Sequence, residues 1–92
     1  MPIHPENPLR RKQVAKSLLE ALNMAGGYAL EESRMFSFID DLIRPPLSFG
    51  EKGTTLQNLK DGGYIRMATD PLDPGMKLWG LTDLGRNYLA SL

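Results

Sequence analysis

The sequence contains no cysteine and only one histidine, His4. Without cysteine there are no disulfide bonds, thiolate zinc sites or cysteine nucleophiles, and one histidine is too few for a histidine-cluster metal site. A histidine-dependent catalytic triad is excluded too, because His4 lies in a proline-rich N-terminal segment. Neither a phosphate-binding glycine loop nor a serine nucleophile elbow occurs. We therefore expect a protein that is not an enzyme and that has no metal ion, cofactor or identifiable small-molecule ligand.

Long hydrophobic runs are also missing, since no apolar segment approaches the roughly 20 residues that span a bilayer. The segment from Met1 to Pro5 does not resemble a signal peptide. The 92 residues, of which 41% are hydrophobic and 24% charged, are typical of one small globular domain. We expect a cytoplasmic protein with no membrane partner.

The chain has no net charge, because 11 lysines and arginines balance 11 aspartates and glutamates. Most free-standing nucleic-acid-binding domains carry a basic excess, so this balance counts against such a function. The charge is nevertheless unevenly distributed. Residues 1–30 carry four basic and two acidic side chains, whereas residues 31–50 carry two basic and four acidic ones.

Prolines at positions 2, 5 and 8 predict an extended arm over residues 1–8, followed by a single domain over residues 9–92. The first helix is predicted over residues 8–24, with Asn7 as its N-cap and Pro8 in the first helical position. Its apolar stripe recurs at every fourth residue, at Val14, Leu18 and Leu22.

A second helix is predicted to start at Glu31, Glu32 and Ser33, and Pro45 and Pro46 end it at or before Arg44. Its apolar face is wide enough to form either core or a dimer interface. This face consists of Met35, Phe36, Phe38, Ile39, Leu42 and Ile43.

The third helix is predicted from about Phe49 to Asp61. Ser48 and Glu51 have the spacing of a capping box, in which a hydroxyl and a carboxylate each accept a hydrogen bond from a backbone amide at the helix start. The residues expected to face inward are Phe49, Leu56 and Leu59.

Three short segments predict a small β-sheet. Residues 64–69 and 76–81 alternate like half-buried strands, and the turn-rich residues 70–75 join them into a hairpin. The segment Tyr28–Leu30 is long enough for one more strand, which would complete a three-stranded sheet.

A last helix is predicted over residues 83–91, with Thr82 as its N-cap. Its apolar side consists of Leu84, Tyr88 and Leu89. We assign Trp79 to the core, because it lies two residues before Leu81 on one strand face, and Tyr88 with it.

The predicted fold is mainly α with a small β-sheet (α+β), in the order α-β-α-α-β-β-α. The run Leu59-Lys60-Asp61-Gly62-Gly63-Tyr64-Ile65 and the run Trp79-Gly80-Leu81-Thr82-Asp83-Leu84-Gly85 resemble those of winged-helix transcriptional regulators. The chain is similar to the metal-sensing and multiple-antibiotic-resistance groups, and to small winged-helix proteins encoded by prophages. This resemblance implies that the third helix enters the major groove of DNA and that the hairpin is the wing.

The exposed face of the third helix supplies the candidate base-reading residues. Thr54 and Asn58 lie nearly opposite Leu56, with Thr55 and Gln57 on the flanks, and their hydroxyl and amide groups suit base edges. An ordinary solvated face is the alternative, because the same face carries acidic residues, Glu51 and Asp61.

Basic residues supply the candidate phosphate contacts. The first group is Arg10 and Arg11, with Lys12 and Lys16, in the first helix. The second group is Arg66 and Lys77 on the hairpin strands, and we expect these two side chains to meet across the strands. A solvated helix start is the alternative for the first group. Asp70 and Asp73 at the hairpin tip count against insertion of the wing into the minor groove.

The function expected from this resemblance is sequence-specific binding of double-stranded DNA by a homodimer that regulates transcription. The alternative is a winged-helix module for protein–protein assembly, in a phage or a multi-subunit complex, with no role in DNA binding. The position of the basic residues distinguishes the two, because only DNA binding requires them on the side that exposes Thr54 and Asn58.

Overall fold

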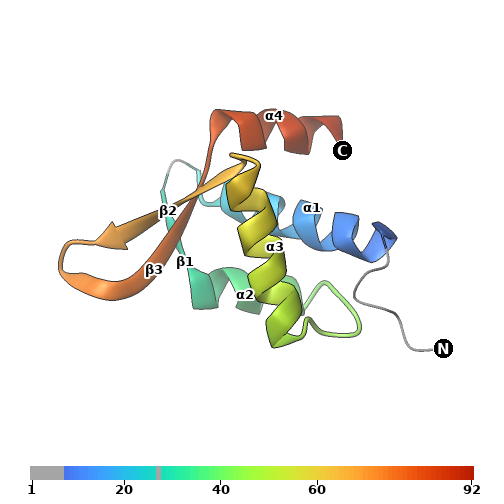
Figure 1. Cartoon of the computed structure of the whole chain (residues 1–92), viewed down its shortest axis with the longest axis horizontal. Coiled ribbons are helices and arrows are strands. Elements are labelled where there is room, and N and C mark those ends of the chain that lie inside the picture. Colours follow the sequence, from blue (N-terminus) through green and yellow to red (C-terminus); the bar gives the residue numbers. More distant parts are fainter. Residues whose placement is uncertain (1–7, 27) are drawn as a thin grey trace.

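The computed structural model describes residues 8–26 and 28–92. In this part of the chain, four helices and three strands follow one another in the predicted order (Figure 1). They are α1 (Pro8–Met24), β1 (Leu30–Glu31), α2 (Glu32–Asp40), α3 (Phe49–Asp61), β2 (Ile65–Asp70), β3 (Asp73–Leu81) and α4 (Asp83–Ser91). The predicted arm lies outside the described residues except for Pro8, which begins α1, and the predicted N-cap Asn7 lies outside them as well.

The core is built around α1, which contacts α2, α3, α4 and β3. Leu18 and Leu19 point to different sides of α1, and both are fully buried. The helix therefore packs against elements on more than one side, which is why its apolar stripe is wide. The core is completed by Val14, Ala21, Leu22, Met35, Phe36, Ile39, Ile43, Leu47, Leu56, Leu59, Ile65 and Trp79.

Helix α2 ends at Asp40, a turn earlier than the prolines require. The amides of Leu42 and Ile43 both donate to the carbonyl of Ile39, so the last turn closes and the chain leaves the helix. Ile43 and Leu47 are buried in the connection that follows. Most of the predicted apolar face of this helix is therefore core, whereas Phe38 and Leu42 are its exposed members.

The three strands form an antiparallel sheet in the order β1-β3-β2. The short strand β1 starts at Leu30, later than predicted, and pairs Leu30 with Trp79. The β2–β3 hairpin, here called the wing, is longer than predicted, because both strands continue into the turn-rich segment until Asp70 pairs with Asp73. The wing projects from the body of the helices (Figure 1).

Helix α4 is attached to the base of the wing by Thr82. Its hydroxyl donates to the carbonyl of Gly63 at 2.6 Å and accepts from the amide of Gly85 at 3.0 Å, which confirms the predicted N-cap. Gly85 is buried against the carbonyl of Tyr64, where a Cβ atom would overlap the carbonyl oxygen. The prediction that Leu84 packs inward is wrong: it is half exposed, because α4 approaches the body through Gly85 instead.

Candidate nucleic-acid interface

The start of α3 has the predicted capping box. The hydroxyl of Ser48 accepts from the amide of Glu51 at 3.1 Å, and the carboxylate of Glu51 accepts from the amide of Ser48 at 3.1 Å. Leu56 and Leu59 face inward as predicted. The prediction for Phe49 is wrong, because its side chain is 93% exposed. Around the helix axis, Phe49 points to the same side as Leu56. Along the axis it lies about 10 Å nearer the start of α3, beyond the core.

Arg10 joins α1 to the start of α3. Its guanidinium donates to both carboxylate oxygens of Glu51, with Nε–Oε2 at 2.8 Å and Nη2–Oε1 at 3.2 Å, and also to the carbonyl of Pro45 at 2.8 Å. The Arg10 side chain is only 6% exposed. We therefore withdraw Arg10 from the candidate phosphate contacts, because its charge is already paired inside the protein.

The Arg10–Glu51 pair holds both groups in their charged forms. The hydrogen bond from Arg10 lowers the pKa of the Glu51 carboxyl, more strongly than burial raises it. The same hydrogen bond raises the pKa of Arg10. The Glu51 carboxylate on α3 is thus neutralised from within the protein.

The outer face of α3 carries the predicted hydroxyl and amide groups. Thr54, Gln57 and Asn58 are exposed, while Thr55 is half-buried toward α1. Gln57 is already engaged, since its Nε2 donates to Oδ1 of Asp61 at 2.8 Å. This bond reduces the donors that Gln57 offers to a partner and partly satisfies the Asp61 carboxylate on the same face.

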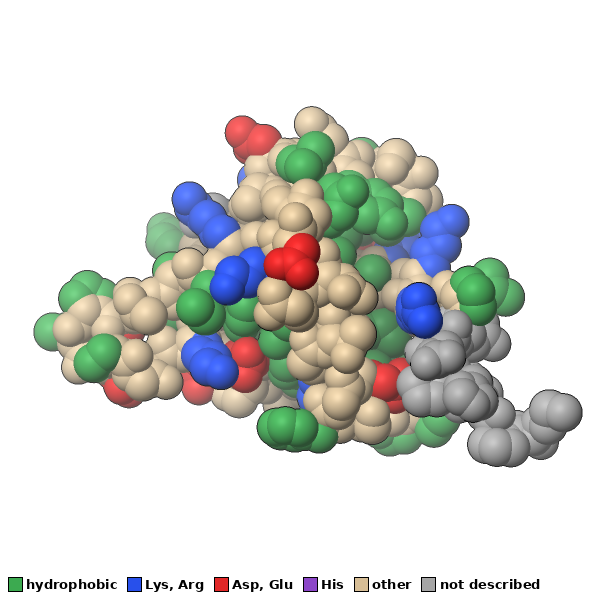
Figure 2. All heavy atoms as spheres, in the orientation of Figure 1, with side chains coloured by type: hydrophobic (Ala, Val, Ile, Leu, Met, Phe, Trp, Pro, Cys, Tyr) green, Lys and Arg blue, Asp and Glu red, His purple; other side chains and the backbone are tan. Residues whose placement is uncertain are grey.

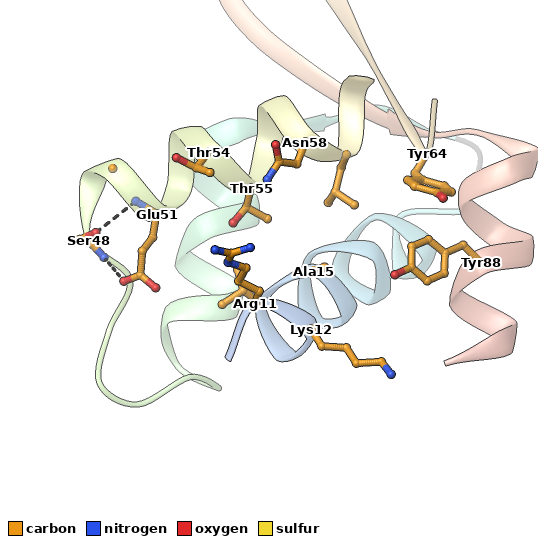
Figure 3. Close-up of a pocket in the computed structure, with 13 residues that line it drawn as sticks. Arg11, Lys12, Ala15, Ser48, Glu51, Thr54, Thr55, Asn58, Tyr64 and Tyr88 are labelled. Atoms are coloured by element: carbon orange, nitrogen blue, oxygen red, sulfur yellow. Dashed lines mark hydrogen bonds between the residues drawn. The ribbon is translucent and has the colours of Figure 1, made fainter. Parts of the chain in front are cut away.

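A groove with a volume of about 840 Å³ runs along one side of α3, between α1 and α4. Figure 3 shows Arg11 extending from α1 toward Thr55, Lys12 pointing outward, and the Tyr88 hydroxyl pointing into the groove from α4. The ring of Tyr88 packs against that of Tyr64, with centroids 4.5 Å apart. Two cations of α1 therefore lie along this side of the polar face.

A second cleft, of about 640 Å³, lies on the other side of α3, between α2, α3 and the wing. Lys52, Lys60 and Lys77 line it, and Trp79 lies at its floor. Lys52 is held by Asp40 at 3.3 Å and lies 5.2 Å from the centre of the Phe36 ring. Within the described residues, neither Lys60 nor Lys77 is paired with a carboxylate.

Lys52 and Lys60 are not among the candidate residues predicted from the sequence. The available signal was the α-helical angle, because Lys60 lies between Leu56 and Gln57 around the helix and so beside the hairpin that follows. Side-chain alternation likewise puts Lys77 on the same sheet face as Trp79.

Arg66 and Lys77 do not meet, contrary to the prediction. Arg66 pairs with Gly80, whereas Lys77 pairs with Thr69. Because alternate residues of a strand point to opposite faces, Arg66 lies on the sheet face away from Lys77 and the second cleft. The register places Arg66 over Gly80, whose missing side chain leaves room for it.

Figure 2 shows the face of the molecule that α3 crosses, in the orientation of Figure 1. Basic side chains lie on both sides of the α3 ridge, and acidic groups lie among them. The residues that flank α3 are Arg11 and Lys12 on one side and Lys52, Lys60 and Lys77 on the other.

No cluster of potential metal ligands occurs in the described part of the chain. Likewise, none of the helices within residues 8–26 and 28–92 has the length and apolar character needed to cross a membrane.

No protein-family model and no curated protein matches the chain. Several solved structures do. The PcaV transcriptional regulator from Streptomyces coelicolor, solved with its natural ligand, matches with a TM-score of 0.66 and 22% identity over 84% of this chain and 49% of PcaV. This chain therefore spans about half the length of PcaV.

Two further structures match over most of their own length. TA0346 from Thermoplasma acidophilum has a TM-score of 0.74 and 12% identity, over 94% of this chain and 80% of TA0346. F93 from STIV, a winged-helix DNA-binding protein, has a TM-score of 0.66 and 24% identity, over 83% of this chain and 78% of F93. At these identities the likeness establishes the fold. Together with the α2–α3 pair and the wing, it shows that this chain has the winged helix-turn-helix fold.

Proposed function

We propose that the protein binds double-stranded DNA sequence-specifically and regulates transcription, with α3 inserted into the major groove. The observation that carries this proposal is the arrangement of charge. Cations flank the exposed hydroxyl and amide groups of α3 on both sides, Arg11 and Lys12 from α1 and Lys60 and Lys77 near the wing. Phosphate groups line both edges of a major groove, so flanking cations and a polar centre match it.

In this proposal Thr54 and Asn58 read base edges, with Thr55 and Gln57 beside them. Arg11 and Lys77 contact phosphates, and Lys60 joins them. Arg66 contacts a phosphate only if the sheet face opposite Lys77 also meets DNA, because the two side chains lie on opposite faces of the sheet. The wing tip stays away from the phosphates, because Asp70 and Asp73 face each other there.

We further propose that the protein acts as a homodimer in the cytoplasm. Two copies related by a two-fold axis would place their α3 helices in successive major grooves, about 34 Å apart. Gel filtration of the pure protein and the spacing of half-sites in selected DNA test this part of the proposal.

Protein–protein assembly is the second candidate function. It is favoured by the zero net charge and by the exposed carboxylate of Asp61 on α3. In that case no DNA sequence is enriched from a random library, and binding to DNA is equally weak for all sequences.

The test is selection of DNA from a random library, followed by binding measurements with Thr54→Ala combined with Asn58→Ala. We expect the double variant to lose preference for the selected site by about 10-fold or more, while its affinity for random DNA stays close to that of the unchanged protein. The matched control is Asn23→Ala with Asn87→Ala, which removes two exposed amides outside the groove and the cleft. Equal losses on all sequences would reject base reading by α3.

A further inference from the structure

Phe49 is the first residue of α3, and 93% of its side chain is exposed. It is outside the core cluster, so the fold gains nothing from the apolar surface of its ring. A large aromatic ring exposed at the start of a helix is available for contact with a partner.

Phe49 lies at the second cleft, where Met67 of the wing is also 45% exposed. Glu32 and Asp40 line this cleft too, and Lys52 is paired with Asp40. The cationic excess of the cleft therefore comes from Lys60 and Lys77. An apolar group among cations fits a partner that is anionic overall and offers a small apolar group between its charges. DNA has this combination in the major groove, where the thymine methyl group lies between the two phosphate backbones.

The ring is also left uncovered by its own helix. Helical side chains lean toward the N-terminus, so the residue four positions later covers the turn to which Phe49 belongs. That residue is Gly53, and a Cβ atom added there would meet nothing within 4 Å. A partner can therefore reach Phe49 along α3 without displacing a side chain.

From these observations we propose that Phe49 contacts the 5-methyl group of a thymine in the major groove, an inference that rests on the proposed DNA binding. The first residues of a recognition helix are those that most often meet base edges. Thr54 and Asn58 supply hydrogen bonds further along α3 and on its opposite side, whereas Phe49 at the N-terminal tip contacts a methyl group, which forms no hydrogen bond.

The test exchanges thymine for uracil, which lacks only the methyl group. The preferred site of the unchanged protein is synthesised with each thymine replaced singly by deoxyuridine, and dissociation constants are measured by fluorescence anisotropy. We expect one thymine in each half-site to matter, with about fourfold weaker binding of the uracil form, the effect of one buried methyl group. Phe49→Ala should bind both forms equally and melt at the same temperature as the unchanged protein.

Leu72→Ala is the matched control. Leu72 is 95% exposed at the wing tip, so this variant also removes an exposed apolar side chain but should keep the preference for thymine. The proposal is overturned if no thymine in the site shows the effect, or if Phe49→Ala still distinguishes thymine from uracil. Loss of dimerisation in Phe49→Ala would instead make Phe49 a subunit contact. If the unchanged protein selects no DNA at all, the proposed function fails and this inference with it.

Discussion

At the scale of single residues, the Glu51 carboxylate has two neighbours that the sequence places far apart. It accepts from the amide of Ser48 three residues before it and from Arg10, which is 41 residues away. The first contact satisfies the backbone amide of Ser48 at the start of α3, and the second attaches this start of α3 to α1. Glu51 therefore links the start of α3 to α1, while Leu56 and Leu59 hold the rest of α3 against the core.

Replacing Glu51 with glutamine tests this link. Glutamine keeps a capping group but removes the charge, so we expect the free energy of unfolding to fall by about 3 kcal/mol at neutral pH, since Arg10 is left buried and unpaired. Urea unfolding measures the change. The control is Glu20→Gln, whose pair with Lys16 is exposed and should contribute less than about 0.5 kcal/mol.

The same pair predicts a pH dependence. The pKa of Glu51 is lower in the folded protein than its ordinary value of 4.5, so its stabilising effect is complete above that value and is lost as the pH falls through the folded-state pKa. The free energies of unfolding of the unchanged protein and of Glu51→Gln should therefore begin to converge as the pH falls below about 4.5, and become equal only below the folded-state pKa. Curves that stay equally far apart down to pH 2 would contradict this assignment.

Trp79 is a core residue, as the sequence predicts, with 5% of its surface exposed. Its Nε1 donates to the carboxylate of Glu32 at 3.0 Å, which joins the sheet to α2. We expect Trp79→Ala to reduce the free energy of unfolding by about 3–5 kcal/mol. Trp79→Phe keeps most of the ring and loses the hydrogen bond, so its cost should be nearer 1 kcal/mol. Equal costs would mean that the hydrogen bond, not packing, fixes this side chain.

Two side chains lie elsewhere than predicted. The basic cluster makes Arg10 a candidate phosphate contact, although it lies four residues before Val14 on the buried stripe of α1. The helical angle puts Phe49 on the inner side of α3, but burial depends also on where along its axis a helix meets its neighbours. That position is set by the connection between α2 and α3, whose buried Ile43 and Leu47 fold it back onto the core. No local pattern in the sequence encodes this packing.

At the scale of elements, we expect opposite effects on stability when two helical glycines are replaced with alanine. Gly85 in α4 touches the backbone of Tyr64, so Gly85→Ala should destabilise the protein by about 3 kcal/mol. Gly53 in α3 has open space around it, so Gly53→Ala should stabilise the protein by up to about 1 kcal/mol through helix propensity. Thermal unfolding of the two variants measures both signs, and destabilisation by Gly53→Ala would show that α3 needs this glycine for its fold.

The bounds of α3 and α4 could be predicted because their starts are set by local capping residues, Ser48 with Glu51 in α3 and Thr82 in α4. The end of α2 and the length of the wing could not, since tertiary packing and cross-strand pairing determine them. For the candidate site, the sequence identified the polar face of α3 and Lys77. It did not identify Lys60, because its place in the cleft depends on how the wing folds beside α3.

At the scale of the whole molecule, the zero net charge conceals a local arrangement in which cations flank α3. If these cations meet phosphates, DNA binding must weaken steeply with salt. We expect Lys60→Gln combined with Lys77→Gln to reduce the slope of log K against log salt by about 2, one unit for each lost phosphate contact. Lys16→Gln, outside the groove and the cleft, should leave the slope unchanged. A double variant with an unaltered slope would place the DNA elsewhere.

The sheet has three strands near Trp79 but only two toward the tip of the wing. β1 pairs only with Leu78 and Trp79, so the part of β3 before Leu78 has a single neighbouring strand. Lys77 lies at the border of the three-stranded part, whereas Asp70 and Asp73 lie at the far end of a two-stranded ribbon held at one end only. In hydrogen exchange, amides near the tip should therefore exchange sooner than those around Trp79. The wing can thus bend its terminal carboxylates away from an approaching polyanion, while the ammonium group of Lys77, beside the three-stranded part, moves less.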